Sequence, residues 1–138
     1  EQRRRLAADA RRLLPGVRAS AQGVTAVSQA LMDARQHEEA WTVAKEGLAQ
    51  VDAPSLLRLQ LGKLAARTGL HREEGLAMLD QVLREPLEGG SGGYAAAHWR
   101  KGQILKDLGR KAEAKAEAEA ALKLDPKHKG AGELYKDL

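Results

Sequence analysis

The sequence predicts an all-α protein of about three stacked helix–turn–helix units with a capping helix at each end, and three observations lead to this fold class. Sequence landmarks recur at regular spacings along the chain. Apolar residues within the recurring segments follow helical periodicity. The 138 residues include no Cys, no Phe, two Trp and two Tyr, so the core must consist mainly of Leu, Ala and Val, which suits closely packed helices.

The repeat is most visible around paired glycines. Two segments each contain a glycine, a second glycine seven residues later and a proline 17 residues after that: Gly62, Gly69 and Pro86, then Gly102, Gly109 and Pro126. The two copies are offset by 40 residues, whereas His37 in a fainter first copy precedes His71 by 34. We expect the Gly-rich stretch Glu88–Gly93 to be a flexible loop that accounts for the difference. Several landmarks at one offset indicate a true internal repeat.

Each unit is expected to contain two helices, because apolar or small residues recur every three to four positions. In the first helices these residues are Val24, Val27, Leu31, then Leu57, Leu61, Leu64, then His98, Gly102, Leu105. In the second helices they are Ala40, Val43, Ala44, Leu48, then Gly75, Met78, Leu79, Val82, then Ala114, Ala118, Ala121, Leu122. Gly69 and Gly109 stand where first helices should end, since glycine readily adopts the left-handed conformation found there. Asp125 and Pro126 mark the end of one helix and the start of the next.

The segment Lys111–Lys123 alternates Ala with Lys or Glu, a period that also fits a strand. Ala, Glu and Lys favour helices strongly and are depleted in strands, so we predict a helix. Its alanines then form two neighbouring stripes: Ala112, Ala116 and Ala120, and Ala114, Ala118 and Ala121. Small side chains on both stripes predict close helix neighbours on both sides.

The last copy, residues 95–126, resembles the tetratricopeptide repeat, a 34-residue helix–turn–helix unit. It has the family's small residues, turn glycine and closing Ala-Leu-x-Leu-Asp-Pro motif, at Gly102, Gly109, Ala114, Ala121 and residues 121–126. Lys101 departs from the family pattern, which usually has an apolar residue there.

Two weaker copies precede it. Residues 55–86 keep both glycines but have Glu74 or Gly75 where Ala is usual. Residues 21–54 form a degenerate copy with Ser28 and Arg35 at the glycine positions.

The resemblance implies a right-handed α-α superhelix whose first helices line a concave groove for a peptide or protein. The expected organisation is one domain, 1–138: an N-terminal helix over 1–16, repeats over 21–54, 55–86 and 95–126, a loop over 87–94, and a C-terminal capping helix over 127–138. Stacking is physically required, because a single helix pair cannot bury its own apolar face.

If the groove is lined as in the family, its residues are Thr25, Gln29, Met32, Leu59, Lys63, Ala66, Trp99, Arg100, Gln103 and Lys106. Trp and Arg are the residue types most enriched at binding hot spots, which favours Trp99 and Arg100. The alternative is that Trp99 packs under the loop Gly89–Gly93 and the cations are merely solvated.

Some family members hold a chaperone's C-terminal carboxylate with Lys, Asn and Arg. Only Arg100 matches that clamp, since Thr25 and Gln29 occupy the Lys and Asn positions, so we exclude this ligand class. Trp41 is expected to pack between repeats.

The sequence lacks the patterns expected of an enzyme or a metalloprotein. Without Cys there is no disulfide and no thiolate metal site. The four histidines, His37, His71, His98 and His128, do not have metal-ligand spacing. No phosphate-binding loop occurs, and Ser91 lacks the context of a nucleophile elbow. We therefore expect no catalytic residues, no metal and no cofactor.

The sequence favours a non-enzymatic protein-interaction or scaffold module. Its net charge of +4 permits an acidic partner without requiring one, and no apolar run reaches the roughly 18 residues of a membrane span. The chain begins with Glu1 rather than Met, which indicates a processed product or part of a longer chain. The absence of Cys fits cytoplasm and periplasm equally.

Two alternative functions stay open. The first is self-association into an oligomer. The second is an accessory role on nucleic acid, in which Arg4, Arg5, Arg11 and Arg12 on one side of the N-terminal helix contact phosphates. Nucleic acid is the less favoured partner, because the Leu and Ala face of this helix suits a cap and the helix has no aromatic residue to stack on bases.

Overall fold

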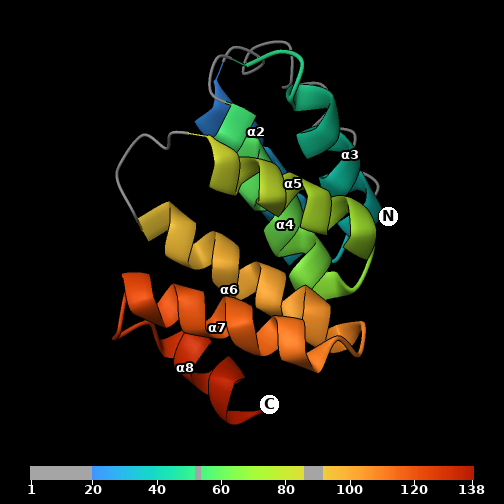
Figure 1. Cartoon of the computed structure of the whole chain (residues 1–138). Coiled ribbons are helices and arrows are strands. Elements are labelled where there is room, and N and C mark those ends of the chain that lie inside the picture. The colour runs from blue at the N-terminus through green and yellow to red at the C-terminus, as the bar shows by residue number, and fades with distance from the viewer. Residues whose placement is uncertain (1–19, 52–53, 86–91) are drawn as a thin grey trace.

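The computed structural model describes residues 20–51, 54–85 and 92–138, which form helices with no strand among them (Figure 1). The helices are α2 (Ala21–Asp33), α3 (His37–Gly47), α4 (Pro54–Thr68), α5 (Arg72–Arg84), α6 (Gly92–Asp107), α7 (Lys111–Leu124) and α8 (Lys129–Lys136). The predicted all-α helical repeat is confirmed. The predicted helix over 1–16 and residues 87–91 of the predicted loop lie outside the described residues.

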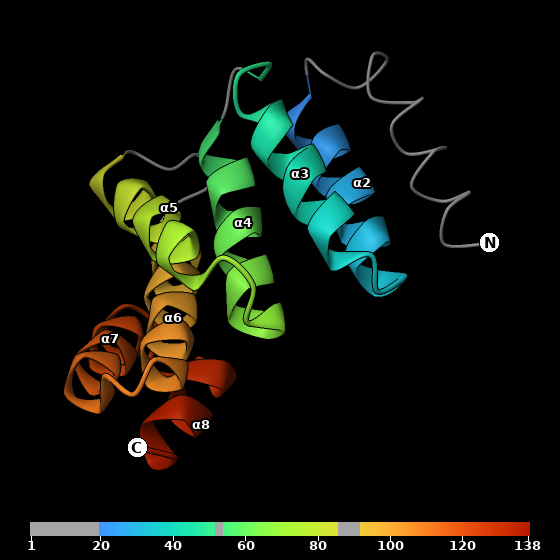
Figure 2. The same ribbon diagram turned by 90° about the vertical axis from the view of Figure 1, so that its right-hand side faces the viewer.

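The helices stack as pairs: α2 with α3, α4 with α5, and α6 with α7. Each pair also contacts the next, with α2 against α4 and α4 against α6, while α8 packs on α6 and α7. Figure 2 shows the pairs following one another in chain order, with α2, α4 and α6 on one side of the stack and α3, α5 and α7 on the other. We call the side formed by α2, α4 and α6 the first-helix face.

The core is a continuous cluster made mainly of Leu, Val and Ala, as the composition predicts, together with Ile104, Met32 and Trp41. Its largest fully buried side chains include Leu31, Leu57, Leu61, Leu64, Leu79 and Ile104. Burying each such side chain contributes about 2 kcal/mol, so stability comes from contacts between units rather than from single helices. At Gly62 the helices approach very closely, because a Cβ placed there would lie 2.3 Å from Cδ2 of Leu79.

The turns within the units follow the predicted glycine positions. Gly69 and Gly109 have φ angles of +76° and +80°, as expected for residues that close a helix. In the degenerate first unit Arg35 adopts the same left-handed conformation, with φ of 63°. The amide of Gln36 then donates to the carbonyl of Leu31 at 2.8 Å, which completes the C-terminal cap of α2.

The C-terminal helix begins later than predicted. Asp125 ends α7 as expected, but Pro126 is not the first residue of the next helix. Instead α8 starts at Lys129, because Nδ1 of His128 accepts a hydrogen bond from the amide of Ala131 at 3.0 Å and caps it.

The first helix of the third unit begins earlier than predicted. Residues 92–94 were expected in the loop but form the first turn of α6. The hydroxyl of Tyr94 donates to the carbonyl of Glu85, and this bond ties the added turn to the end of α5.

The helix α7 has close neighbours on one stripe only. Ala114, Ala118 and Ala121 are fully buried, whereas Ala112 and Ala116 are exposed and Ala120 is half-buried. The prediction that both stripes are covered is therefore wrong in the described part of the chain. The stripe of Ala114, Ala118 and Ala121 is covered by the packing of α7 in the stack, whereas α8, although it contacts α7, leaves Ala112 and Ala116 exposed.

Candidate functional site

The first-helix face carries most of the residues predicted to line a groove. Nine of the ten are half-buried: Thr25, Gln29, Leu59, Lys63, Ala66, Trp99, Arg100, Gln103 and Lys106. Met32 is only 5% exposed and belongs to the core cluster. Leu59 and Ala66 also pack against this core, so the polar and aromatic residues form the accessible part of the face.

A chain of hydrogen bonds connects the first two units across this face. Nζ of Lys63 on α4 donates to Oε1 of Gln29 on α2 at 2.9 Å. The amide of Gln29 donates in turn to Oδ1 of Asp33, also at 2.9 Å. Beneath them, Nε2 of the buried Gln60 lies 3.3 Å from Oγ of Ser28. Sequence reasoning missed Asp33 and Gln60, although Asp33 lies one helical turn after Gln29.

Trp99 and Arg100 form a fixed pair on α6. The guanidinium carbon of Arg100 lies 3.7 Å from the centroid of the Trp99 ring, within the range of a cation–π contact. Nη1 of Arg100 donates to Oε1 of Gln103 at 3.0 Å, which holds the guanidinium in place. The indole also packs against α8, since a Cβ at Gly130 would lie 2.4 Å from the ring and the His128 ring lies 5.0 Å from it. A C-terminal helix that caps the last repeat was predicted, but its contact with Trp99 was not.

Three cations gather on the face where α4 and α6 meet: Lys63, Arg67 and Arg100, here called the cation cluster. Burial, and then the charges of Arg100 and Arg67, lower the pKa of Lys63, an effect that Asp33 partly offsets. Burial, and then the charge of Arg67, lower the pKa of Arg100 to about 10. Within the described residues no carboxylate forms an ion pair with any of the three.

The neighbouring cation Lys101 is paired twice. Its Nζ lies 2.8 Å from Oδ1 of Asp80 on α5 and 3.0 Å from Oε1 of Glu117 on α7. The second oxygen of Glu117 lies 2.6 Å from Nδ1 of His98. Burial lowers the pKa of Lys101, but the bonds to Asp80 and Glu117 outweigh it and raise the pKa. Lys101 therefore joins the second unit to the third, which explains why a charged residue replaces the family's apolar one.

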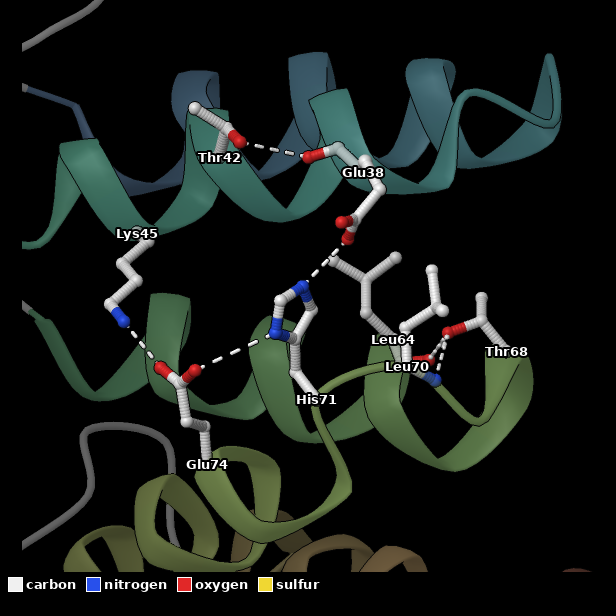
Figure 3. A network of polar contacts seen from close by, with 8 residues as sticks. All are labelled: Glu38, Thr42, Lys45, Leu64, Thr68, Leu70, His71 and Glu74. Carbon is white, nitrogen blue, oxygen red and sulfur yellow. Dashed lines mark hydrogen bonds and ion pairs between the residues drawn. The ribbon is translucent and has the colours of Figure 1, made fainter.

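A second polar network joins the first two units on the opposite side (Figure 3). Nε2 of His71 lies 2.6 Å from Oε1 of Glu38, its Nδ1 lies 3.5 Å from Oε1 of Glu74, and Lys45 pairs with Glu74. The His71 ring stacks on Trp41 with centroids 4.4 Å apart. Trp41 is 5% exposed, so it packs between units as predicted. This network holds units together and is separate from the first-helix face.

A cavity of about 240 Å³ opens between α4, α6 and α8. Its lining includes four predicted groove residues, Ala66, Trp99, Gln103 and Lys106, together with Asp107, Glu133 and Asp137. Nζ of Lys106 lies 3.7 Å from Oδ2 of Asp137, so this cation, unlike the cation cluster, has a carboxylate nearby. The contribution of α8 escaped sequence reasoning because it depends on how the chain folds back.

Within residues 20–51, 54–85 and 92–138, no group of three or more His, Asp or Glu side chains is arranged to hold a metal ion. In the same part of the chain, no helix combines the length and hydrophobicity needed to cross a bilayer.

The comparison with protein families agrees with the geometry of the third unit. Residues 95–128, which include most of α6, all of α7 and the turn between them, match the family model described as Tetratricopeptide repeat. This segment is similar to a tetratricopeptide repeat. The suspected family resemblance is thereby confirmed, and the tetratricopeptide repeat indicates a module that interacts with proteins. No curated protein matches the chain.

Proposed function

We propose that this protein is a non-enzymatic interaction module that binds a segment of a partner protein on its first-helix face. The observation that carries the proposal is the Trp99–Arg100 pair, whose guanidinium lies 3.7 Å from the indole centroid and is also bonded to Gln103. Trp and Arg dominate hot spots in protein interfaces. Because these side chains are already ordered, binding would lose little conformational entropy.

The surroundings of this pair support a bound polypeptide. The cavity beside Trp99 has apolar walls from Ala66 and Leu134 and polar groups from Gln103 and Lys106. Such a mixture suits a partner side chain that is apolar along its length and polar at its end. The ordered side chains of three successive first helices extend the surface beyond the cavity, as an extended segment requires.

The test begins with selection of twelve-residue peptides from a random display library by the full chain. Selected peptides should bind at least about tenfold more weakly to Trp99→Ala and to Arg100→Gln, as expected for hot-spot residues. Circular dichroism should show unchanged helical content. Arg100→Gln is the cleaner variant, because Trp99 also packs against α8.

The chain offers a matched control pair. Nζ of Lys115 lies 5.5 Å from the centroid of the exposed Tyr135 ring, so these residues form a second cation–aromatic pair. Lys115 belongs to α7, and the pair therefore lies outside the first-helix face. Tyr135→Ala and Lys115→Gln should leave peptide affinity within about twofold, because exposed residues outside an interface contribute little. The proposal fails if both pairs of variants affect binding equally, or if Arg100→Gln has no effect.

The two alternatives drawn from the sequence remain predictions. Self-association is tested by sedimentation at several protein concentrations. The arginines on which nucleic-acid binding depends lie outside the described residues.

A further inference from the structure

The charges on the first-helix face are unevenly distributed. Lys63 and Arg67 lie one helical turn apart on α4, and Arg100 lies on the adjacent α6. Two of the three are held in place, since Lys63 bonds to Gln29 at 2.9 Å and Arg100 is fixed over its indole. The cation cluster therefore contains two ordered cations, Lys63 and Arg100, with the exposed Arg67 beside them.

The positive charge of the cluster is not neutralised by ion pairs within the described residues. Arg100 and Lys101 are adjacent on α6, yet Lys101 bonds to two carboxylates whereas Arg100 has none in the described part of the chain. Partial burial, and after it repulsion within the cluster, lowers the pKa of both Lys63 and Arg100. Like charges held together at a cost to stability are typical of sites that bind a ligand of opposite charge.

Acidic groups limit the positive surface at both ends. Asp33 lies at the α2 end, where it accepts a hydrogen bond from Gln29. At the α8 end, the cavity is lined by Asp107, Glu133 and Asp137. A long acidic run laid across the face would meet these carboxylates and be repelled.

The size of the positive surface sets the length of its ligand. Axes of packed helices such as α4 and α6 are about 8–10 Å apart. An extended chain advances about 3.3 Å per residue, so about three residues span the two helices. A segment of this length can offer a separate carboxylate to each of the three cations, which are distributed over both helices and along a turn of α4. Side-chain carboxylates of neighbouring residues in the partner fit this spacing better than one terminal carboxylate.

From this arrangement we propose that the partner segment carries a short internal acidic stretch of about three residues, flanked by neutral or basic residues, and that Lys63, Arg67 and Arg100 select it. This inference rests on the proposed function, because it concerns the segment bound on the same face. It specifies the chemistry of that segment: Asp and Glu side chains at the centre, and no long acidic run.

The test uses the peptides selected from the display library and two triple variants of equal charge change. The first is Lys63→Gln, Arg67→Gln, Arg100→Gln in the cation cluster. The second, as control, changes cations on the second helices: Arg84→Gln, Lys111→Gln, Lys123→Gln. Selected peptides should be enriched in two to three clustered Asp or Glu residues, and their affinity should fall at least about tenfold for the first variant and less than about twofold for the control.

Further measurements distinguish acidic side chains of the peptide from its terminal carboxylate, and test whether the cation cluster lowers the stability of the protein. Replacing the central acidic residues of the peptide by Asn or Gln should weaken binding. Lengthening the acidic stretch to eight residues should also weaken binding. Amidating the C-terminus of the peptide should have no effect. The thermal midpoint of the cation-cluster variant should equal or exceed that of the unmodified chain, because repulsion is removed. Loss of binding on amidation, or selection of peptides without acidic enrichment, would overturn the inference.

Photo-crosslinking separates this inference from the proposed function. A photoreactive residue at position 103, on the first-helix face, should capture the selected peptides. If neutral or basic peptides are selected and captured there, the interaction function stands and the acidic specificity is wrong. If no peptide is selected, or selected peptides crosslink only elsewhere, both proposals fail.

Discussion

The close approach of α4 and α5 at Gly62 makes the substitution Gly62→Ala a sharp test of the repeat packing. The added Cβ would lie 2.3 Å from Cδ2 and 2.4 Å from Cγ of Leu79. Carbon atoms in contact prefer about 3.5–4.0 Å, so one of them must move by more than about 1 Å. Leu79 is fully buried and has no solvent to move into, so the strain must spread to the rotamer of Leu79 or to the spacing of the helices.

Two opposing effects determine how much Gly62→Ala changes the free energy of unfolding. Ala is favoured over Gly by about 1 kcal/mol inside a helix. Overpacking a well-filled core costs about 1–3 kcal/mol, and a contact this short belongs to the upper part of that range. We therefore expect Gly62→Ala to lower the free energy of unfolding by about 1–2 kcal/mol, measured by urea denaturation followed by circular dichroism.

The control is Gly132→Ala in α8. In the described part of the chain nothing lies within 4 Å of the position that its Cβ would take, so only helix propensity acts and stability should rise by up to about 1 kcal/mol. Combining Gly62→Ala with Leu79→Ala should cost less than the sum of the two single changes, because truncation makes room for the methyl group. If Gly62→Ala stabilises the protein as Gly132→Ala does, α4 and α5 are not in this close contact.

Three further predictions concern stability. Arg35→Gly should raise the free energy of unfolding in urea by about 0.5–1 kcal/mol, because it relieves a left-handed conformation, and a lower value would contradict this. Burial raises the pKa of Glu117, but hydrogen bonds with His98 and Lys101 outweigh it and hold the pKa below its usual value, so its stabilisation is present above about pH 4.5 and is lost as pH falls through the folded-state pKa. Glu117→Gln should therefore lose stability at pH 7 and show a weaker decline below about pH 4 in thermal melts, whereas parallel pH profiles would refute the role of this carboxylate. Trp41→Ala should cost about 3 kcal/mol in urea unfolding, and a cost under 1 kcal/mol would show that packing between the first units contributes little.

The fold was predictable where the information is local. Turn glycines such as Gly69 and Gly109, the spacing of apolar residues and the strong helix formers of α7 all act within a few residues. The covered stripe of α7 was not predictable in this way, because Ala114 and Ala116 are identical in size and propensity. The side that becomes buried depends on α6 and α8, whose positions are set by tertiary contacts.

The candidate site was predictable to a similar extent. Trp99 and Arg100 were identified from residue type and repeat position, and the structure shows them paired. Arg67 was missed because it lies outside the repeat positions used for the prediction. Its spacing of four residues from Lys63 was a usable signal, since residues i and i+4 share a helix face. The carboxylate of Asp137 left no such signal, because it reaches Lys106 only through the packing of α8.

The contrast between Arg100 and Lys101 shows how one helix serves both folding and recognition. Successive residues on a helix point about 100° apart, so two adjacent cations meet different surroundings. Lys101 lies between two carboxylates on α5 and α7 and is fully paired within the stack. Arg100 lies beside an indole, a glutamine and other cations, none of which neutralises it. A stacked repeat must satisfy the charges that it buries between units, whereas the charges left unsatisfied on the first-helix face remain available to a partner.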